Sequence, residues 1–563
     1  MENSKVIVLG LGGADFDVLN ALIAAGELPN CGALASEGLS GKLETIIHPA
    51  LPTTFASLTT GLNPGKHGIY DFFQRIPNSY GIAPVNARLL GGTPLWTYLS
   101  ELGKRVGVIN APITYPPQKV NGFLVTGMGT PDLTCPSTFP PRLADNLRSA
   151  VKDYVIDVYE RNLSEGEYLQ KLLYIFDKRM EATDYLLSRY TDLDFLFVSF
   201  SVFDHFHRLF WKYIDPARPQ PSSDQATIFR NALKTCYRSL DDLVGQLLLK
   251  ENEDRLSIII VSDRGFGPLH KVFYINQWLT ELGLLKLKHN SPAETSFLEA
   301  VDWAETKAYS YGAFGNLYLN LQGREPHGIV EQGRQAKEVK EFLERQLHQL
   351  KVPGEERSIV SQVFRKEDLY SGPRFWEAPD LLVILEDYSC LPVSRTTFGA
   401  KDVFALPEEA WPTGTTLAPS GSSRLNGFFL ARGPHFSSGA TVEGIGIIDL
   451  APTILHAMGL PVPREMDGKV LECGFEASYL QSAPIRAATP KSRPGNDKAR
   501  LWGENITIEE LERELKRKDV HIAELKEEVN TLNEVIRRFQ QGRFMRVARK
   551  VQEIRNKIFG SQG

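Results

Sequence analysis

The sequence predicts an α/β protein in which helices cover both faces of a mostly parallel sheet, followed by a C-terminal coiled-coil helix. Short apolar runs alternate with helical stretches over most of the chain, which is typical of parallel strands joined by crossover helices. Val6–Leu11 is a continuous apolar run that ends in glycines, as expected of a buried parallel strand. A heptad pattern near the C-terminus predicts the coiled coil.

Apolar runs predict the strands of the α/β part, and helical spacing of apolar residues predicts its helices. Strands are predicted at Val6–Leu11, Val106–Asn110, Phe195–Phe200, Leu256–Val261, Leu381–Leu385 and Gly427–Ala431. Helices are predicted at Asp17–Ala25, Tyr168–Arg189 and Asn231–Lys250. In such a fold, we expect the functional side chains on the loops that follow the carboxyl ends of the strands.

The chain is predicted to divide into four parts. Residues 1–475 form the α/β domain, and residues 476–505, rich in Pro, Ser, Gly and Lys, form a flexible linker. In residues 506–541, apolar side chains from Ile508 to Phe539 are spaced in threes and fours, with β-branched residues at a and mostly leucine at d. This pattern favours a parallel two-stranded coiled coil, with itself or a partner; one amphipathic helix docked on the main domain is the alternative.

Residues 543–560 carry basic and apolar side chains at helical spacing, which predicts a basic amphipathic helix. Such a helix suits an anionic membrane surface, although a solvated helix end has the same composition. Charge is concentrated here: the 29 residues from Val535 to Gly563 hold eight cations and one anion, within a chain of formal net charge -5. The remainder of the chain is acidic, so we expect no nucleic-acid partner.

Composition places the chain among ordinary globular proteins. Its 563 residues are 42% hydrophobic and 23% charged, which excludes a disordered or fibrous class. Five cysteines are scattered singly, without a C-x-x-C pair, and this favours a reducing compartment over a disulfide framework. We therefore expect a cytoplasmic protein, peripheral at the inner membrane surface if the basic helix binds there, without a membrane span.

Two glycine-rich loops do not match the nucleotide-binding patterns. The loop Gly10–Asp15 follows a strand, but Asp15 stands where the dinucleotide fingerprint needs its third glycine. The loop Gly61–His67 lacks the phosphate-loop spacing and the Ser or Thr that follows its lysine. Neither loop predicts a nucleotide cofactor.

Seven segments together resemble the alkaline phosphatase superfamily, specifically its type I phosphodiesterase/nucleotide pyrophosphatase branch, in the bacterial group described as phosphohydrolases or phosphomutases. They lie at residues 6–15, 48–72, 203–215, 261–268, 307–330, 369–383 and 420–434, in the family's order. The resemblance implies an alkaline phosphatase-like sheet. It also implies two divalent metals, usually zinc, that clamp a phosphoryl group while a Thr or Ser attacks phosphorus.

The metal-binding pattern that the resemblance implies is largely missing. The family uses three Asp and three His from the ends of separate strands, and two of these positions keep a carboxylate, Asp204 and Asp263. The other four positions hold Gly12, Arg208, Arg264 and Ser423. The family's nucleophile falls on Leu51 without a gap, and on Thr53 or Thr54 after a small shift.

The replacements introduce fixed positive charge. Arginine stays protonated and cannot ligate a metal, and Asp204 and Arg208 stand at i, i+4 with the anion first, the favourable order for pairing on a helix. Two carboxylates left without metals would be costly in a partly buried site, and two guanidiniums offset that cost. We therefore expect Arg208 and Arg264 to take the place of the metals, with no cofactor.

Three hypotheses remain open. In the first, the protein is a catalytically impaired relative that binds a phosphorylated or sulfated small molecule through Arg208, Arg264, Asp204, Asp263, Ser423 and the Thr53/Thr54 loop. In the second, it is an active phosphodiesterase, phosphohydrolase or phosphomutase that holds Zn, Mn or Mg with relocated ligands. His207 is the main candidate ligand for this second hypothesis, with His205, Asp15, Asp17, His48 and His67 nearby in the sequence. In the third, the domain is a scaffold that acts through its coiled coil.

Overall fold

The computed structural model describes residues 4–488 except 132–134, 159–161, 216–222, 251–254, 289–296, 353, 355, 395–401 and 412–416. These residues belong to one compact unit, Met1–Thr489. The predicted coiled coil at 506–541, the basic helix at 543–560 and the predicted linker from residue 489 onward lie outside the described residues.

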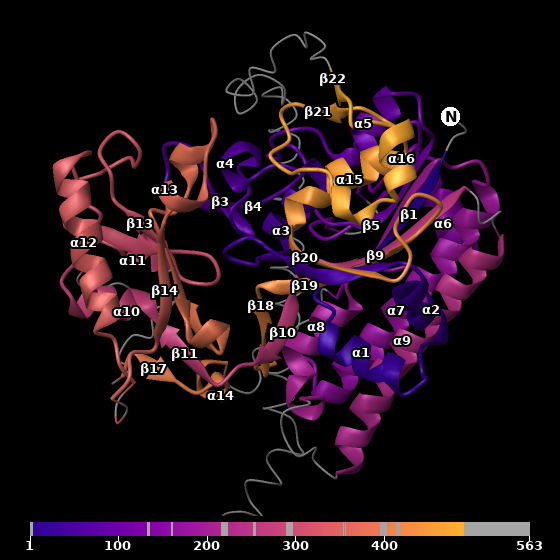
Figure 1. The fold of residues 1–563 in the computed structure, drawn as a ribbon. Helices are drawn as coiled ribbons and strands as arrows, with labels where there is room; N and C mark the ends of the chain where they lie inside the picture. Colours follow the sequence, from indigo (N-terminus) through magenta and orange to yellow (C-terminus); the bar gives the residue numbers. More distant parts are fainter. Residues whose placement is uncertain are drawn as a thin grey trace, which may run out of the picture. The chain divides into compact units, whose positions relative to one another are not determined.

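A nine-stranded sheet forms the centre of the described unit, with the order β20-β2-β19-β9-β1-β8-β5-β6-β7. β1 lies between β8 and β9 and is parallel to both, whereas β19 is antiparallel to β9 and β2. The predicted α/β class with a mostly parallel sheet is therefore confirmed (Figure 1). The strands are β1 Lys5–Leu11, β2 Leu39–Glu44, β5 Val106–Ala111, β6 Gly122–Thr126, β7 Thr138–Phe139, β8 Phe195–Phe200, β9 Leu256–Ser262, β19 Asn426–Arg432 and β20 Ala440–Gly446.

Helices pack on both faces of this sheet because its strands alternate side chains between two apolar clusters. In β1, Leu9 and Leu11 join one cluster while Val6 and Val8 join the other. The first cluster is covered by α1 Phe16–Ala24, α2 Pro29–Glu37, α6 Leu143–Ala150, α7 Glu165–Arg189, α8 Val202–Phe210 and α9 Asp224–Lys250. The second is covered by α3 Leu51–Thr60, α5 Leu95–Glu101, α15 Leu450–Ala457 and α16 Ala477–Ser482.

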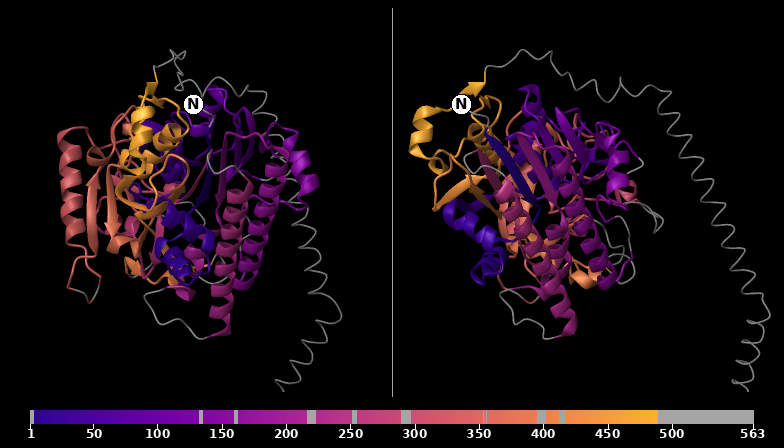
Figure 2. Two further views of the ribbon diagram at one scale, coloured as in Figure 1. Left: turned by 45° about the vertical axis from the view of Figure 1, so that its right-hand side comes forward. Right: turned by 90° about the vertical axis from the view of Figure 1, so that its right-hand side faces the viewer.

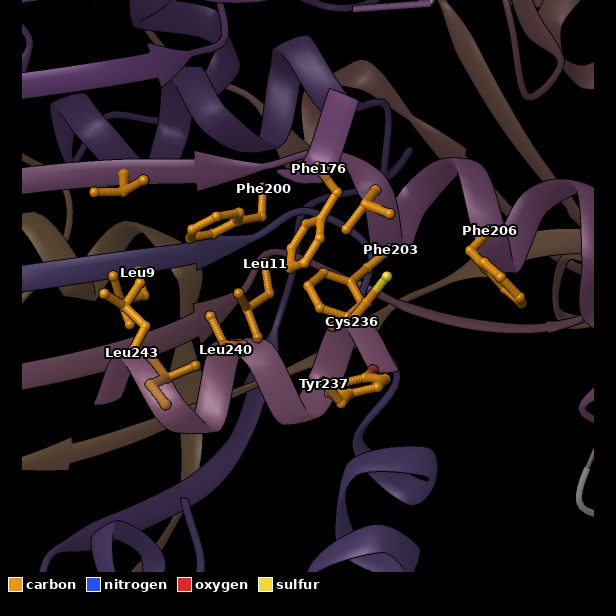
Figure 3. Close-up of a cluster of buried hydrophobic side chains, with 14 of the residues drawn as sticks. Leu9, Leu11, Phe176, Phe200, Phe203, Phe206, Cys236, Tyr237, Leu240 and Leu243 are labelled. Atoms are coloured by element: carbon orange, nitrogen blue, oxygen red, sulfur yellow. The ribbon is translucent and has the colours of Figure 1, made fainter. Parts of the chain in front are cut away.

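The long helices α7 and α9 run side by side on one face, and α8 lies against the same apolar cluster (Figures 1 and 2). Figure 3 shows Phe200 and Phe203 packed near Leu11 and Leu240 in this cluster. Each such buried side chain contributes about 1.5–3 kcal/mol of hydrophobic stabilisation. This packing holds the start of α8, and with it Asp204, against the end of β1.

A separate four-stranded sheet has the order β12-β13-β15-β14, and all of its paired strands are antiparallel. The predicted strand at Leu381–Leu385 is β15 of this sheet and does not belong to the central one. An apolar run shows that both faces of a strand are buried, as they are here, but does not identify its neighbours. The strands are β12 Ala308–Ser310, β13 Asn316–Leu319, β14 Val360–Arg365 and β15 Leu381–Leu385.

Apart from α12, the remaining elements are short. The small sheets pair β3 Phe73–Arg75 with β4 Ile82–Pro84, β10 Gly265–Pro268 with β18 Gly421–Arg424, β11 Lys271–Tyr274 with β16 Cys390–Val393 and β17 Phe404–Ala405, and β21 Val462–Pro463 with β22 Ala487–Ala488. The other helices are α4 Pro64–His67, α10 Ile275–Glu281, α11 Phe297–Ala300, α12 Arg334–His348, α13 Lys366–Leu369 and α14 Pro407–Ala410.

The predicted linker begins too early. Residues 476–488 belong to the folded unit, because α16 forms there and β22 pairs with β21. Tyr479 anchors this segment: its ring stacks on His435 with 3.9 Å between centroids, and its hydroxyl donates to the carbonyl of His456. Composition alone did not reveal these contacts. Among the described residues no single helix is long and apolar enough to cross a membrane, and the bent pair α1–α2 passes that test only when taken together.

Candidate functional site

The candidate site lies at the carboxyl ends of β1, β8 and β9, where ligands bind in open parallel sheets. Gly12 follows β1, Asp204 lies in the first turn of α8 after β8, and Asp263 and Arg264 follow β9. β10 and β18 form a ribbon beside them, in which Ser423 pairs with Phe266. The topology thus brings together all six positions at which the family resemblance placed metal ligands.

Arg264 is the centre of this arrangement. Its side chain is fully buried, Nη1 donates to Asp263 Oδ2, and Nη2 donates to Asp204 Oδ1. A second guanidinium reaches the same oxygen, because Arg208 Nη2 lies 2.8 Å from Asp204 Oδ1. The predicted pairing of Asp204 with Arg208 is confirmed, and one guanidinium joins the two carboxylates.

The charges in this cluster are strongly stabilised by one another. Burial alone would raise the pKa of Asp204, but the neighbouring Arg208 and Arg264 outweigh it and hold that pKa well below its usual range. Burial opposes the charge of Arg264 as well, yet the two aspartates raise its pKa above the ordinary value. Asp204 and Arg264 therefore stay ionised near neutral pH, and the cluster pairs two carboxylates, Asp204 and Asp263, with two guanidiniums, Arg208 and Arg264.

One hydroxyl group of α3, that of Thr54, lies against the same cluster. Thr54 Oγ1 donates to Asp263 Oδ2 and lies 3.0 Å from the Leu51 carbonyl, while the amide of Gly13 donates to Asp263 Oδ1 at 3.0 Å. Thr53 is also buried, and its hydroxyl has no hydrogen-bond partner. Of the two candidate nucleophile positions, Thr54 contacts a family ligand position and Thr53 does not.

The histidines proposed as relocated ligands have other partners. His207 Nδ1 lies 2.8 Å from the Gly13 carbonyl, and burial lowers the pKa of His207. His205 lies between Asp157 and Tyr168, at 3.0 and 2.7 Å. His48 Nδ1 lies 3.1 Å from the Tyr388 hydroxyl, and His67 Nε2 lies 2.9 Å from Ser57 Oγ.

The aspartates proposed beside them do not complete a metal site. Asp15 accepts the amides of Asp17 and Val18 as the N-cap of α1. Within the described part of the chain, no three His, Cys, Asp or Glu side chains are grouped so that they could hold a metal ion. The residues present do not fit the pair of divalent metals that the family resemblance implies, because a guanidinium stands between the two carboxylates.

A comparison with protein families covers most of the described unit. Residues 6–393 match the family described as type I phosphodiesterase / nucleotide pyrophosphatase. The chain belongs to this family. This is a family of phosphoric ester hydrolases. The family predicted from the sequence is therefore confirmed.

The comparisons with individual proteins add little to this family assignment. No curated protein matches this phosphodiesterase-family chain. Two crystal structures of phosphonoacetate hydrolase from Sinorhizobium meliloti 1021, in complex with phosphonoacetate and with phosphonoformate, are similar to it. In each case the identity is 16%, the TM-score is 0.49, and the match covers 81% of this chain and 95% of the hydrolase.

Sequence reasoning missed two side chains of this family member. Phe266 lies beneath both guanidiniums, with its ring centre 5.6 Å from Arg208 Cζ and 5.9 Å from Arg264 Cζ. It stands inside a segment that carried the family resemblance, so its position near the site could have been expected. Arg179 of α7 lies near Asp204 with its side chain buried, and no motif in the sequence distinguishes it from other arginines.

Proposed function

We propose that this protein is a family member that does not hydrolyse phosphoesters and serves as a phospho-ligand-binding or scaffold protein. The observation that carries the proposal is the fully buried Arg264 guanidinium, which hydrogen-bonds to Asp204 and Asp263 at once. A metal at this place would have to displace a buried cation from both of its partners. Catalytic zinc normally needs three protein ligands, and each implied metal position keeps one carboxylate.

Without a suitable set of metal ligands, the site lacks what the family uses for phosphoester hydrolysis. In the family reaction, divalent metals polarise the ester and stabilise the charge that develops on oxygen. Arg264 cannot supply that function to a substrate, because both of its Nη groups are already engaged with aspartates and its side chain has no exposed surface. The Thr54 hydroxyl is likewise engaged with Asp263. These contacts support a stable but unreactive centre.

A ligand-binding role is supported by Arg208. Its side chain is 31% exposed and, within the described residues, Nη2 is its only nitrogen that forms a hydrogen bond. Arginine presents several donors in a fixed plane and suits phosphoryl and sulfuryl groups. We propose a phosphorylated or sulfated small molecule as the ligand and the 506–541 segment as the means of coupling to a partner. The location we propose is the cytoplasm, at the inner membrane surface when the 543–560 segment binds anionic lipid.

The competing function is metal-dependent hydrolysis with relocated ligands. The discriminating experiment measures metal content of the purified full-length protein and its hydrolysis of bis(4-nitrophenyl) phosphate in added Zn, Mn or Mg. We expect substoichiometric metal and no turnover above the rate with buffer alone, for the wild type and for Asp263→Ala alike. Stoichiometric metal, with metal-dependent turnover that Asp263→Ala abolishes, would overturn the proposal.

A further inference from the structure

A groove lies between helix α12 and strand β14, in the part of the molecule that holds the four-stranded sheet (Figure 1). Its volume is about 460 Å³, which is within the range of ligand pockets. The helix residues that line it are three or four apart and the strand residues are two apart, so each wall is one face of its element. We call it the α12–β14 groove. Its lining residues are Glu341, Glu344, Arg345 and His348 of α12, and Val363 and Arg365 of β14.

β14 is the edge strand of its sheet. It pairs with β15 on one side, and in the described part of the chain no strand pairs with its other side. A register shift between Val360 and Gln362 interrupts the strand, so its regular edge begins near Val363. An edge strand offers unpaired amides and carbonyls to an extended chain that lies beside it.

The backbone of Val363 faces this open edge. Lys366 donates its amide to the Asp380 carbonyl at 3.3 Å, on the side of β15. Arg365, one residue earlier, instead donates its amide to Asp368 Oδ2 at 3.3 Å. Successive residues of a strand direct their backbone groups to opposite sides, so Val363 presents its amide and its carbonyl away from β15. Its half-buried side chain lines the groove.

One cation in the groove is left without an ionic partner. Glu344 accepts two hydrogen bonds from the guanidinium of Arg365, both at 2.6 Å. Glu341 lies 3.8 Å from Lys337 Nζ, so each carboxylate of the groove has a cation nearby. Arg345 is exposed and forms no ion pair with any described residue. An acidic side chain that enters the groove would therefore find its partner in Arg345.

We propose that the α12–β14 groove binds an extended peptide segment of a partner protein, which adds a strand to the sheet beside β14. Main-chain hydrogen bonds to such an edge give affinity, and every second side chain gives specificity. The groove specifies the peptide: an apolar side chain lies opposite Val363, and an acidic side chain on the same face of the peptide reaches Arg345. This inference goes beyond the proposed phospho-ligand and does not depend on the Arg264 centre.

The side-chain part of the inference is tested with random short peptides displayed on phage and selected on the full-length protein. Arg345→Glu reverses a charge inside the groove, and Arg334→Glu is its matched control on the same helix, because Arg334 is 92% exposed and does not line the groove. In fluorescence anisotropy, we expect enriched peptides to bind Arg345→Glu about tenfold more weakly than Arg334→Glu. Replacing the acidic residue of the peptide by lysine should restore binding to Arg345→Glu.

The backbone part of the inference is tested without changing the protein. In an added strand, only every second amide of the peptide donates to β14. Methylation of one alternate set of amide nitrogens in an enriched peptide should therefore abolish binding, and methylation of the other set should preserve it. The unmethylated peptide should also slow hydrogen exchange of residues 360–365, measured by mass spectrometry.

Three results would overturn the inference: no peptide enriched above selection on an unrelated protein, equal binding to Arg345→Glu and Arg334→Glu, or equal effects of the two methylated sets. Exchange at β14 that is slow without peptide and becomes faster on dilution would place a second copy of this chain in the groove, and would also overturn it. The phospho-ligand and the absence of hydrolysis are tested by other measurements, so the proposed function can fail or stand separately.

Discussion

Replacing Arg264 by Met keeps much of the side-chain volume and removes the guanidinium that hydrogen-bonds to Asp204 and Asp263. Breaking a buried ion pair by removing one partner costs about 3–5 kcal/mol, because the remaining charge is left uncompensated. The entropy of unfolding of a unit this size is on the order of 1 kcal/mol/K, so the melting temperature should fall by about 3–5 °C. Differential scanning calorimetry at pH 7 measures that fall.

The melting temperature of Arg264→Met should also depend on pH, which a simple loss of packing would not produce. In the wild type the pKa of Asp204 is depressed despite its burial, so its stabilising contribution is present above about pH 4 and is lost as the pH falls further. In Arg264→Met, burial is opposed by Arg208 and His205 and no longer by Arg264. The melting temperature of the variant should therefore recover toward the wild-type value as the pH falls from 7 to 5.

The control for this prediction is the triple variant Arg264→Met with Asp204→Asn and Asp263→Asn. It removes the charges as a group, and a buried ion cluster replaced by neutral residues of similar volume loses little or no stability. The triple variant should therefore melt above Arg264→Met alone. Two results would contradict the prediction: a melting temperature of Arg264→Met within about 1 °C of the wild type, or a triple variant that melts lowest. Either would show that Arg264 does not compensate the charges of Asp204 and Asp263.

Three further predictions concern other parts of the molecule. Thr54→Val should lower stability by about 1.5–3 kcal/mol, because a hydrogen bond to a buried charged group is lost; Thr54→Ser should retain most of it in urea titrations, and equal stability of the two variants would contradict the contact with Asp263. Burial raises the pKa of Asp71 to about 7, although the amides of Ala313 and Phe72 donate to it. Its ionisation thus disfavours the folded state, stability should decline as the pH rises from about 4 to 7, and Asp71→Asn should flatten that decline in melting curves; parallel curves for both proteins would refute it. Truncation after residue 488 should convert a dimer into a monomer in light scattering. A truncated protein that is still a dimer would exclude the predicted coiled coil as the dimer contact.

The family and the pairing of Asp204 with Arg208 could be predicted because each depends on local sequence. An apolar run followed by glycines indicates a buried strand, and an i, i+4 spacing fixes which side chains share a helix face. The structure bears both out, with β1 at the centre of the sheet and a 2.8 Å contact between Asp204 and Arg208. The placement of Arg264 between the two aspartates also follows from family order, since β8 and β9 both neighbour β1.

Other features depend on contacts between residues far apart in the sequence. Arg179 reaches the site because α7 packs beside β8, and a lone arginine in an amphipathic helix gives no signal of that. The same limit explains why β15 was expected in the central sheet, because its antiparallel partners, β13 and β14, cannot be identified from its own sequence. It explains the early start predicted for the linker as well, because Tyr479 packs on His435, 44 residues upstream.

Whether Arg264 takes the place of the metals is tested most directly in a crystal soaked in zinc chloride, with diffraction data collected at the zinc absorption edge. We expect guanidinium density for Arg264 between Asp204 and Asp263, with no anomalous peak at either carboxylate. A zinc peak within about 2.0–2.2 Å of an Asp204 or Asp263 oxygen, with the Arg264 side chain turned away, would contradict it.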